Sequence, residues 1–212
     1  MPPEGKGRAL AEVVLFHSAL GLRSGVTDAA RRLREQGHVV HLPDLYDGLS
    51  FGGGREGYDA GVRRMEELGW TTIVDRAWAA VEALSPALVY LGFSMGAGIA
   101  QELAIHRPGA RGAILIGGGG AYDDEPWPLG VPVDAHHMVD DPWVDEFAPV
   151  RLARLAARAG SCSSVYLYPG DQHLFTDPGL PDEYDHALTE LVWRRIMRFL
   201  IRLEAGYIPS RG

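Results

Sequence analysis

The chain has 212 residues, of which 46% are hydrophobic and 23% charged, the composition of an average soluble globular protein. Its formal net charge of -8 argues against nucleic acid as a partner and gives no attraction to an anionic membrane. The single cysteine, Cys162, excludes an internal disulfide. No apolar run approaches membrane-spanning length and the polar N-terminus lacks a signal-peptide core, so we expect a cytoplasmic protein.

Apolar strands alternate with amphipathic helices along the chain. This alternation predicts right-handed crossovers and a mostly parallel central sheet flanked by helices. We expect a glycine-rich loop at 47–57, and a break near Gly69 in the helix that follows it. No linker, repeat or large cap domain is evident, so residues 1–212 are expected to form one α/β domain. The predicted strands are 11–17, 38–42, 87–91, 110–116, 131–138 and 164–168, and the predicted helices are 27–36, 58–84, 95–106, 143–159 and 182–203.

The most informative segment is 88–98, Leu-Val-Tyr-Leu-Gly-Phe-Ser-Met-Gly-Ala-Gly. It contains the pattern G-x-S-x-G, with Ser94 at its centre, between an apolar strand and a segment with helical spacing. A nucleophile at a sharp strand-to-helix turn needs residues without side chains two positions before and after it, as Gly92 and Gly96 provide. The pattern therefore predicts that Ser94 is a catalytic nucleophile.

A serine hydroxyl needs a histidine to take its proton, and that histidine needs a carboxylate to orient it. In hydrolases of this architecture the three follow the order serine, acid, histidine. After the strand 131–138 come Asp140 and Asp141, and after the strand 164–168 comes His173. The carboxyl ends of parallel strands meet at one sheet edge, so we expect these groups beside Ser94. Spacing alone does not choose between the two aspartates.

These segments resemble the dienelactone hydrolase family of α/β-hydrolases, and the similarity covers nearly the whole chain. The resemblance implies an α/β-hydrolase fold with Ser94, Asp141 and His173 as catalytic residues. Asp141 is preferred over Asp140 because the Pro-Trp-Val that follows it fits the family's register. The segments that carry the resemblance are Val-Val-Leu-Phe-His-Ser-Ala-Leu-Gly-Leu (13–22), Leu-Pro-Asp-Leu-Tyr-Asp-Gly (42–48), His-Met-Val-Asp-Asp-Pro-Trp-Val (137–144), Tyr-Pro-Gly-Asp-Gln-His-Leu-Phe (168–175) and the elbow.

The chain departs from the family's namesake enzymes at three positions. Those enzymes have cysteine at the elbow, where this chain has Ser94, and often have glutamate where Ser18 stands. They also place an arginine four residues after the histidine to help hold the substrate carboxylate. Here that position is Asp177, which is expected to repel an anion. The resemblance therefore favours hydrolysis of an ester or lactone more than it favours dienelactone itself.

The same architecture predicts an oxyanion hole made of two backbone N–H groups. One belongs to Met95, the residue after the nucleophile, and the other comes from the loop after the first strand. Matching that loop to the family places the second donor at Ala19. The side chains expected to line the substrate pocket are Ser18, Phe51, Tyr122, Trp127 and Trp143.

His136 and His137 are the neighbours that most suggest a metal site. Adjacent residues of a strand point to opposite faces, so they are poor co-ligands, and we expect one in the core and one in solvent. We expect no metal and no cofactor.

The sequence thus predicts a serine hydrolase that cleaves an ester or lactone of a small carboxylic acid through an acyl-enzyme. A thioesterase or peptidase with the same three residues remains an alternative, because pocket shape selects the leaving group. A catalytically silent hydrolase fold that binds a ligand is the alternative from another class. We expect a small-molecule substrate, no nucleic-acid or membrane partner, and a monomer or homodimer.

Overall fold

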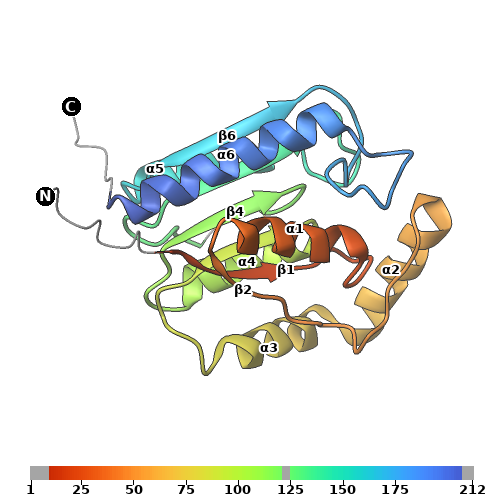
Figure 1. Cartoon of the computed structure of the whole chain (residues 1–212), viewed down its shortest axis with the longest axis horizontal. Helices are drawn as coiled ribbons and strands as arrows, with labels where there is room; N and C mark the ends of the chain where they lie inside the picture. The colour runs from red at the N-terminus through yellow and green to blue at the C-terminus, as the bar shows by residue number, and fades with distance from the viewer. Residues whose placement is uncertain (1–9, 121–124, 207–212) are drawn as a thin grey trace, which may run out of the picture.

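The computed structural model describes residues 10–120 and 125–206. Within them six parallel strands form one sheet in the order β2–β1–β3–β4–β5–β6 (Figure 1). The strands are β1 (Glu12–Phe16), β2 (Val39–His41), β3 (Val89–Phe93), β4 (Gly112–Ile116), β5 (Val133–Met138) and β6 (Ser163–Tyr168).

Helices cover both faces of the sheet, as Figure 1 shows, so the predicted fold class is confirmed. Two of them pack on one face and three on the other, while α2 lies to the side of the sheet. The helices are α1 (Ser24–Glu35) and α6 (His186–Glu204) on the first face, α3 (Trp70–Val81), α4 (Met95–His106) and α5 (Ala148–Arg158) on the second, and α2 (Gly54–Leu68).

The apolar runs of the strands follow from this double cover. In β1, Val13 and Leu15 enter the core under α1 and α6, whereas Val14 and Phe16 enter the core under the other three helices. A strand buried on both faces needs apolar residues at every position rather than at alternate ones. The continuous apolar sequences of β3 and β4 meet the same requirement, and all five residues of each are buried.

The order of the strands reverses between β1 and β3. From β1 the chain passes outward to β2, then returns across the sheet to β3 and continues in the opposite direction. Open parallel sheets bind ligands beyond the carboxyl ends of their strands at such a reversal. The residues that follow β1 and β3 are Ala19 and Ser94 among others, so two predicted site residues lie at this point of the fold.

Several predicted boundaries are wrong, among them the start of α6, which is His186 instead of 182. Helix α1 begins at Ser24 instead of 27, and α2 begins at Gly54, inside the segment predicted as a loop. Helix α5 begins at Ala148 instead of 143, because the Asp145 side chain accepts the Phe147 N–H at 2.8 Å and forms a turn first. The predicted break at Gly69 is confirmed, with a φ of 76° that favours glycine.

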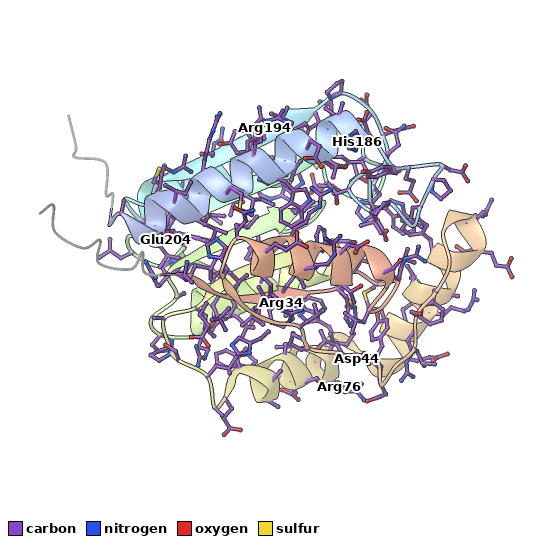
Figure 2. The ribbon with its side chains drawn as sticks, viewed as in Figure 1. Arg34, Asp44, Arg76, His186, Arg194 and Glu204 are labelled. Carbon is purple, nitrogen blue, oxygen red and sulfur yellow. The ribbon has the colours of Figure 1, made fainter. Side chains whose placement is uncertain are left out.

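Side chains also fix the loop that leads from β2 into α2. Asp44 accepts the Tyr46 N–H at 2.9 Å, and Arg76 of α3 donates to the Leu45 carbonyl at 2.6 Å. Arg76 also pairs with Asp47 at 2.8 Å; Asp44 and Arg76 are labelled in Figure 2. None of the helices in the described ranges is long and apolar enough to cross a membrane.

Candidate active site

Ser94 occupies the turn between β3 and α4 in a backbone conformation that is rare for a residue with a side chain. Its φ is 52° and its ψ is -114°. The Ser94 N–H donates to the Ile116 carbonyl at 2.8 Å, and the Ser94 carbonyl accepts the Ala97 N–H at 2.8 Å. Hydrogen bonds from both neighbouring elements therefore hold the strained residue in place.

The two glycines of the motif are required by close backbone contacts. A Cβ at Gly92 would lie 1.9 Å from the carbonyl oxygen of Gly96. A Cβ at Gly96 would lie 2.4 Å from the Phe16 oxygen and 2.6 Å from the His17 oxygen. Backbone atoms cannot move aside as a side-chain tip can, so any other residue would displace the turn from β1.

Three predicted residues form one hydrogen-bonded chain. The Ser94 hydroxyl and His173 Nε2 are 2.7 Å apart, and His173 Nδ1 is 2.7 Å from Asp141 Oδ2. The carboxylate accepts at Nδ1, so that nitrogen carries the proton and Nε2 is left to accept from the hydroxyl. Asp141 and His173 are buried, with 7% and 5% of their surfaces exposed, so water does not screen their interaction.

The structure separates Asp141 from Asp140. The second carboxylate oxygen of Asp141 accepts the Trp143 N–H at 2.9 Å, which fixes the orientation of the group. Asp140 is exposed, and its N–H donates to the Gly170 carbonyl at 3.0 Å. The aspartate that fits the family's register is therefore the one that contacts the histidine.

The loop after β1 is rigid and brings Ala19 to the site. His17 donates from Nδ1 to the Ser18 carbonyl at 2.7 Å and accepts the Leu45 N–H at Nε2 at 3.1 Å. Burial lowers the pKa of His17, which keeps the ring neutral and able to accept. No hydrogen bond to the N–H of Ala19 or Met95 is found in the described part of the chain, so both donors remain available.

A cavity of about 290 Å³ opens above Ser94 and His173. None of its described lining residues is an arginine or lysine, and most of the surface is apolar or aromatic. The residues that line it are Ser18, Ala19, Leu20, Tyr58, Val62, Met65, Ser94, Met95, Gly117, Gly118, Trp143 and His173. A larger hollow of about 610 Å³ lies between α1 and α6 and contains none of the predicted site residues.

The predicted pocket residues are only partly brought together. Ser18 and Trp143 line the cavity. Phe51 does not, because it packs into the hydrophobic core beside Tyr46. Trp127 is 3% exposed in the core, where its indole N–H donates to the Val131 carbonyl at 2.6 Å, so the prediction that it forms a pocket wall is wrong. Tyr122 lies outside the described residues.

Helix α2 supplies the wall that the sequence analysis did not predict. Tyr58, Val62 and Met65 point into the cavity from one face of this helix. Their spacing of four and three residues is that of neighbours on a helix surface, which is the signal that could have identified them. Gly61 lies on the same helix, and a Cβ there would lie 2.5 Å from the Ala19 oxygen, so α2 approaches the loop after β1 closely.

Tyr58 connects this wall to the histidine loop. Its ring stacks on Trp143 with centroids 5.2 Å apart and lies 6.1 Å from the ring of His173. Its hydroxyl donates to Glu183 at 2.8 Å, and the same carboxylate oxygen accepts the Leu174 N–H at 3.0 Å. Burial, followed by the hydrogen bond to Glu183, raises the pKa of Tyr58, so the hydroxyl stays protonated and donates.

Asp177 does not present its charge to the cavity. It forms an ion pair with Arg23 at 3.2 Å, and both side chains are largely buried. Arg23 also donates to the carbonyls of Phe51 and Gly179. Asp177, which stands where the namesake enzymes have a substrate-binding arginine, therefore has a structural contact instead: its ion pair with Arg23 links three segments of the fold.

The expectation that one of the two adjacent histidines faces solvent is wrong. His136 and His137 are 0% and 1% exposed, because α6 covers one face of β5 and α5 covers the other. His136 Nδ1 and the Tyr168 hydroxyl form a hydrogen bond with a distance of 2.8 Å between the two atoms. Burial lowers the pKa of His136 to about 3 and that of His137 to about 4, so both rings are neutral near pH 7.

The sheet order, the elbow and the hydrogen-bonded chain define a hydrolase of the α/β-hydrolase fold. Within that class the assignment is specific: the sequence matches the family model of the dienelactone hydrolases over residues 2–203, and the chain belongs to this family. A search of curated proteins found no relative by sequence.

Solved structures share the fold at low sequence identity. A dienelactone hydrolase-like promiscuous phosphotriesterase from metagenomic libraries is 21% identical, with a TM-score of 0.72 over 94% of this chain and 89% of its own. A protein of Klebsiella pneumoniae subsp. pneumoniae, provisionally described as a dienelactone hydrolase, is 19% identical, with a TM-score of 0.65 over 94% and 89% of the two chains. The Bacillus cereus carboxylesterase is 14% identical, with a TM-score of 0.56 over 94% and 92%.

Proposed function

We propose that this chain is a serine hydrolase that cleaves an uncharged ester or lactone of a small carboxylic acid. The observation that carries the proposal is the continuous chain from Asp141 through His173 to Ser94, with 2.7 Å at each hydrogen bond, at the base of a cavity. Both distances are those of strong hydrogen bonds and need no rearrangement before reaction.

The proposed reaction has two halves. Ser94 Oγ attacks the carbonyl carbon while its proton passes to His173 Nε2, and Asp141 stabilises the imidazolium that forms. The tetrahedral intermediate collapses, the C–O bond to the leaving group breaks, and His173 returns the proton to the departing alkoxide. Water then gives a proton to His173 and attacks the acyl-serine; the bond from the acyl carbon to Ser94 Oγ breaks, His173 returns the proton to Oγ, and the acid and free Ser94 are released.

The N–H groups of Ala19 and Met95 are the proposed oxyanion hole. They come from the loop after β1 and the first residue of α4, and both residues line the cavity with Ser94. Backbone donors that are already fixed stabilise the developing negative charge without reorganisation. Gly96 supports this pair, because its contact with the Phe16 and His17 carbonyls sets the distance between the two elements.

The cavity wall supports a small, uncharged substrate. A volume of about 290 Å³ is at the lower end of the range for ligand pockets. A carboxylate in the substrate would find no cationic partner among the described lining residues, and burying an unpaired charge is unfavourable. We include in the proposal a cytoplasmic location, no nucleic-acid or membrane partner, and a monomer or homodimer.

Labelling with a fluorophosphonate tests the proposal, because the reagent reacts with an activated serine whatever the substrate. We expect one label per chain, located by mass spectrometry in the peptide that contains Ser94, and none in Ser94→Ala. Ser163→Ala, in β6 at the opposite end of its strand from His173, should label like the parent protein. Well-folded protein without label on Ser94 would refute the proposal. Label with turnover of thioesters or peptides but not esters would keep the mechanism and change the substrate class.

A further inference from the structure

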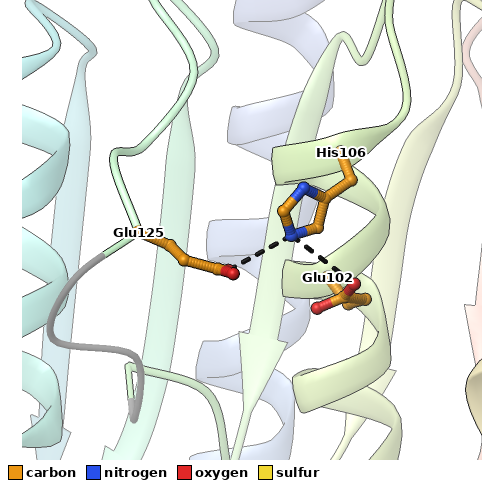
Figure 3. Close-up of side chains that lie close together, drawn as sticks. All are labelled: Glu102, His106 and Glu125. Atoms are coloured by element: carbon orange, nitrogen blue, oxygen red, sulfur yellow. Dashed lines mark hydrogen bonds and ion pairs between the residues drawn. The ribbon is translucent and has the colours of Figure 1, made fainter. Parts of the chain in front are cut away.

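The last turn of α4 carries a second cluster of polar side chains, at the end of the helix opposite Ser94. Glu102 and His106 lie four residues apart, so they are neighbours on the helix surface. Glu125, from the segment between β4 and β5, approaches the same imidazole from outside the helix. Figure 3 shows the ring of His106 between the two carboxylates, and neither glutamate has a part in the proposed hydrolysis.

The three donor atoms have the spacing of metal ligands. His106 Nε2 is 3.5 Å from Glu102 Oε1 and 3.2 Å from Glu125 Oε2, and all three atoms lie within 4.8 Å of one another. Zinc bonds of about 2.0–2.2 Å at tetrahedral angles place neighbouring ligand atoms about 3.3–3.6 Å apart. Two sides of the triangle therefore have nearly this length already, and only the separation of the carboxylates must shorten.

The charge of the cluster also suits a divalent cation. Two carboxylates and a neutral imidazole compensate a charge of two, and in residues 10–120 and 125–206 neither glutamate pairs with an arginine. The nearest arginine in sequence, Arg107, instead donates to the carbonyls of Val81, Leu84 and Ser85. The carboxyl end of a helix carries partial negative charge, so α4 itself favours a cation beside His106.

The mixture of donors selects the kind of ion. One imidazole nitrogen with two carboxylate oxygens suits zinc, whereas magnesium prefers oxygen ligands alone. The side chains of His106 and Glu125 are 40% and 43% exposed, which leaves a fourth position open to water. We propose that Glu102, His106 and Glu125 form a zinc site that fastens α4 to the segment between β4 and β5. The site lies at the end of α4 away from the cavity, so the ion would take no part in the proposed hydrolysis.

Calorimetric titration of the full chain with Zn²⁺, after treatment with a chelator, tests the proposal. We expect one ion per chain, no competition from Mg²⁺ at equal concentration, and an increase in Tm with zinc. His106→Ala should weaken binding by at least about tenfold, since one of three protein ligands is lost. Glu125→Gln should weaken it similarly, and this exposed side chain can change without disturbing α4.

His41→Ala is the matched control. His41 Nε2 also contacts a carboxylate, that of Glu12 at 2.8 Å, but its ion pair has one carboxylate instead of two. Its removal should leave zinc affinity unchanged. The proposal is overturned if the parent chain shows no saturable binding, which would leave the cluster as a hydrogen-bonded pair only. It is equally overturned if His106→Ala and Glu125→Gln bind as tightly as the parent chain, which would place the ion elsewhere, for example at His173.

Discussion

The two helices that border the cavity are held in place very differently. Helix α4, which begins directly after Ser94, has eight of its 12 residues buried. Helix α2, which provides the opposite wall, has three of its 15 residues buried, namely Gly57, Tyr58 and Gly61. The proposed nucleophile therefore adjoins the best-packed helix, whereas the proposed substrate wall belongs to one of the least packed.

This contrast separates catalysis from selectivity. Backbone contacts around Ser94 leave no space for even one methyl group, so the nucleophile has one position. The wall formed by α2 depends on a few side-chain contacts and can accept other residues at little cost to the core. Changes at the turn around Ser94, where α4 begins, should lower turnover or stability strongly, whereas changes on α2 should alter which substrate is used.

The largest effect is expected from Asp141→Asn. The Trp143 N–H would keep the amide oxygen, so the amide NH₂ would face His173 Nδ1. That nitrogen would then have to accept, which puts the ring proton on Nε2 and prevents it from receiving the Ser94 proton. We expect kcat for a small ester to fall about 10⁴-fold, as measured by steady-state kinetics. Asp140→Asn is the control and should stay within about twofold; equal losses in both variants would contradict the assignment.

Gly96→Ala should damage both stability and activity. Alanine is the better helix former by about 1 kcal/mol, but the added Cβ would lie 2.4 Å from the Phe16 oxygen. We expect a loss of about 2–3 kcal/mol in the free energy of unfolding, measured with urea, together with a large fall in kcat.

Gly98→Ala is the matched control for that change, because Gly98 lies in the same helix, two positions after Gly96. Its Cβ would meet only the tip of the Trp70 side chain, at 3.1 Å, and that side chain can move. We expect the stability of this variant to stay within about 1 kcal/mol of the parent protein. A Gly96→Ala variant as stable and active as Gly98→Ala would show that the elbow tolerates displacement.

The same contrast explains what the sequence could and could not predict. The elbow depends on two glycines within five residues, and Asp141 and His173 follow strands whose ends must meet, so these features are visible in local patterns. The wall depends on contacts between distant residues: Tyr58 bonds to Glu183, 125 positions away. Trp127 is an aromatic residue of the kind that often lines a pocket, but its indole N–H donates to the Val131 carbonyl, so the side chain can be buried in the core.

An effect that is small near neutral pH and grows only in acid is expected from His137→Leu. The pKa of His137 is lowered to about 4 in the folded protein, against an ordinary value of 6.5, mainly because the ring is buried. Between these values the unfolded chain binds a proton that the folded chain does not, so stability falls as the pH decreases through this window.

Leucine cannot take up a proton in the unfolded chain, so the variant does not lose stability in this way. As the pH is lowered below 6.5, its free energy of unfolding should rise relative to that of the parent protein by about 1.4 kcal/mol per pH unit, reaching about 3 kcal/mol at pH 4. Urea unfolding at several pH values measures the difference, in which the contributions of His136 and of Asp134 cancel. His186→Gln is the control, because that side chain is exposed and should give curves parallel to those of the parent protein. Parallel curves for His137→Leu as well would contradict a neutral buried ring.

The smallest effect is expected from Tyr58→Phe, which tests whether α2 acts on selectivity alone. The change removes the hydroxyl that donates to Glu183 but keeps the ring stacked on Trp143. One hydrogen bond to a carboxylate contributes about 1–2 kcal/mol, so α2 should loosen while the core and the elbow stay intact. We expect KM to rise by a few fold, more for bulky esters than for acetate esters, with kcat nearly unchanged.

Glu183 also holds the Leu174 N–H beside His173, so Glu183→Gln should lower kcat as well. If Tyr58→Phe lowered kcat as much as Glu183→Gln does, the wall and the catalytic residues would be coupled, and the separation between the two helices would fail.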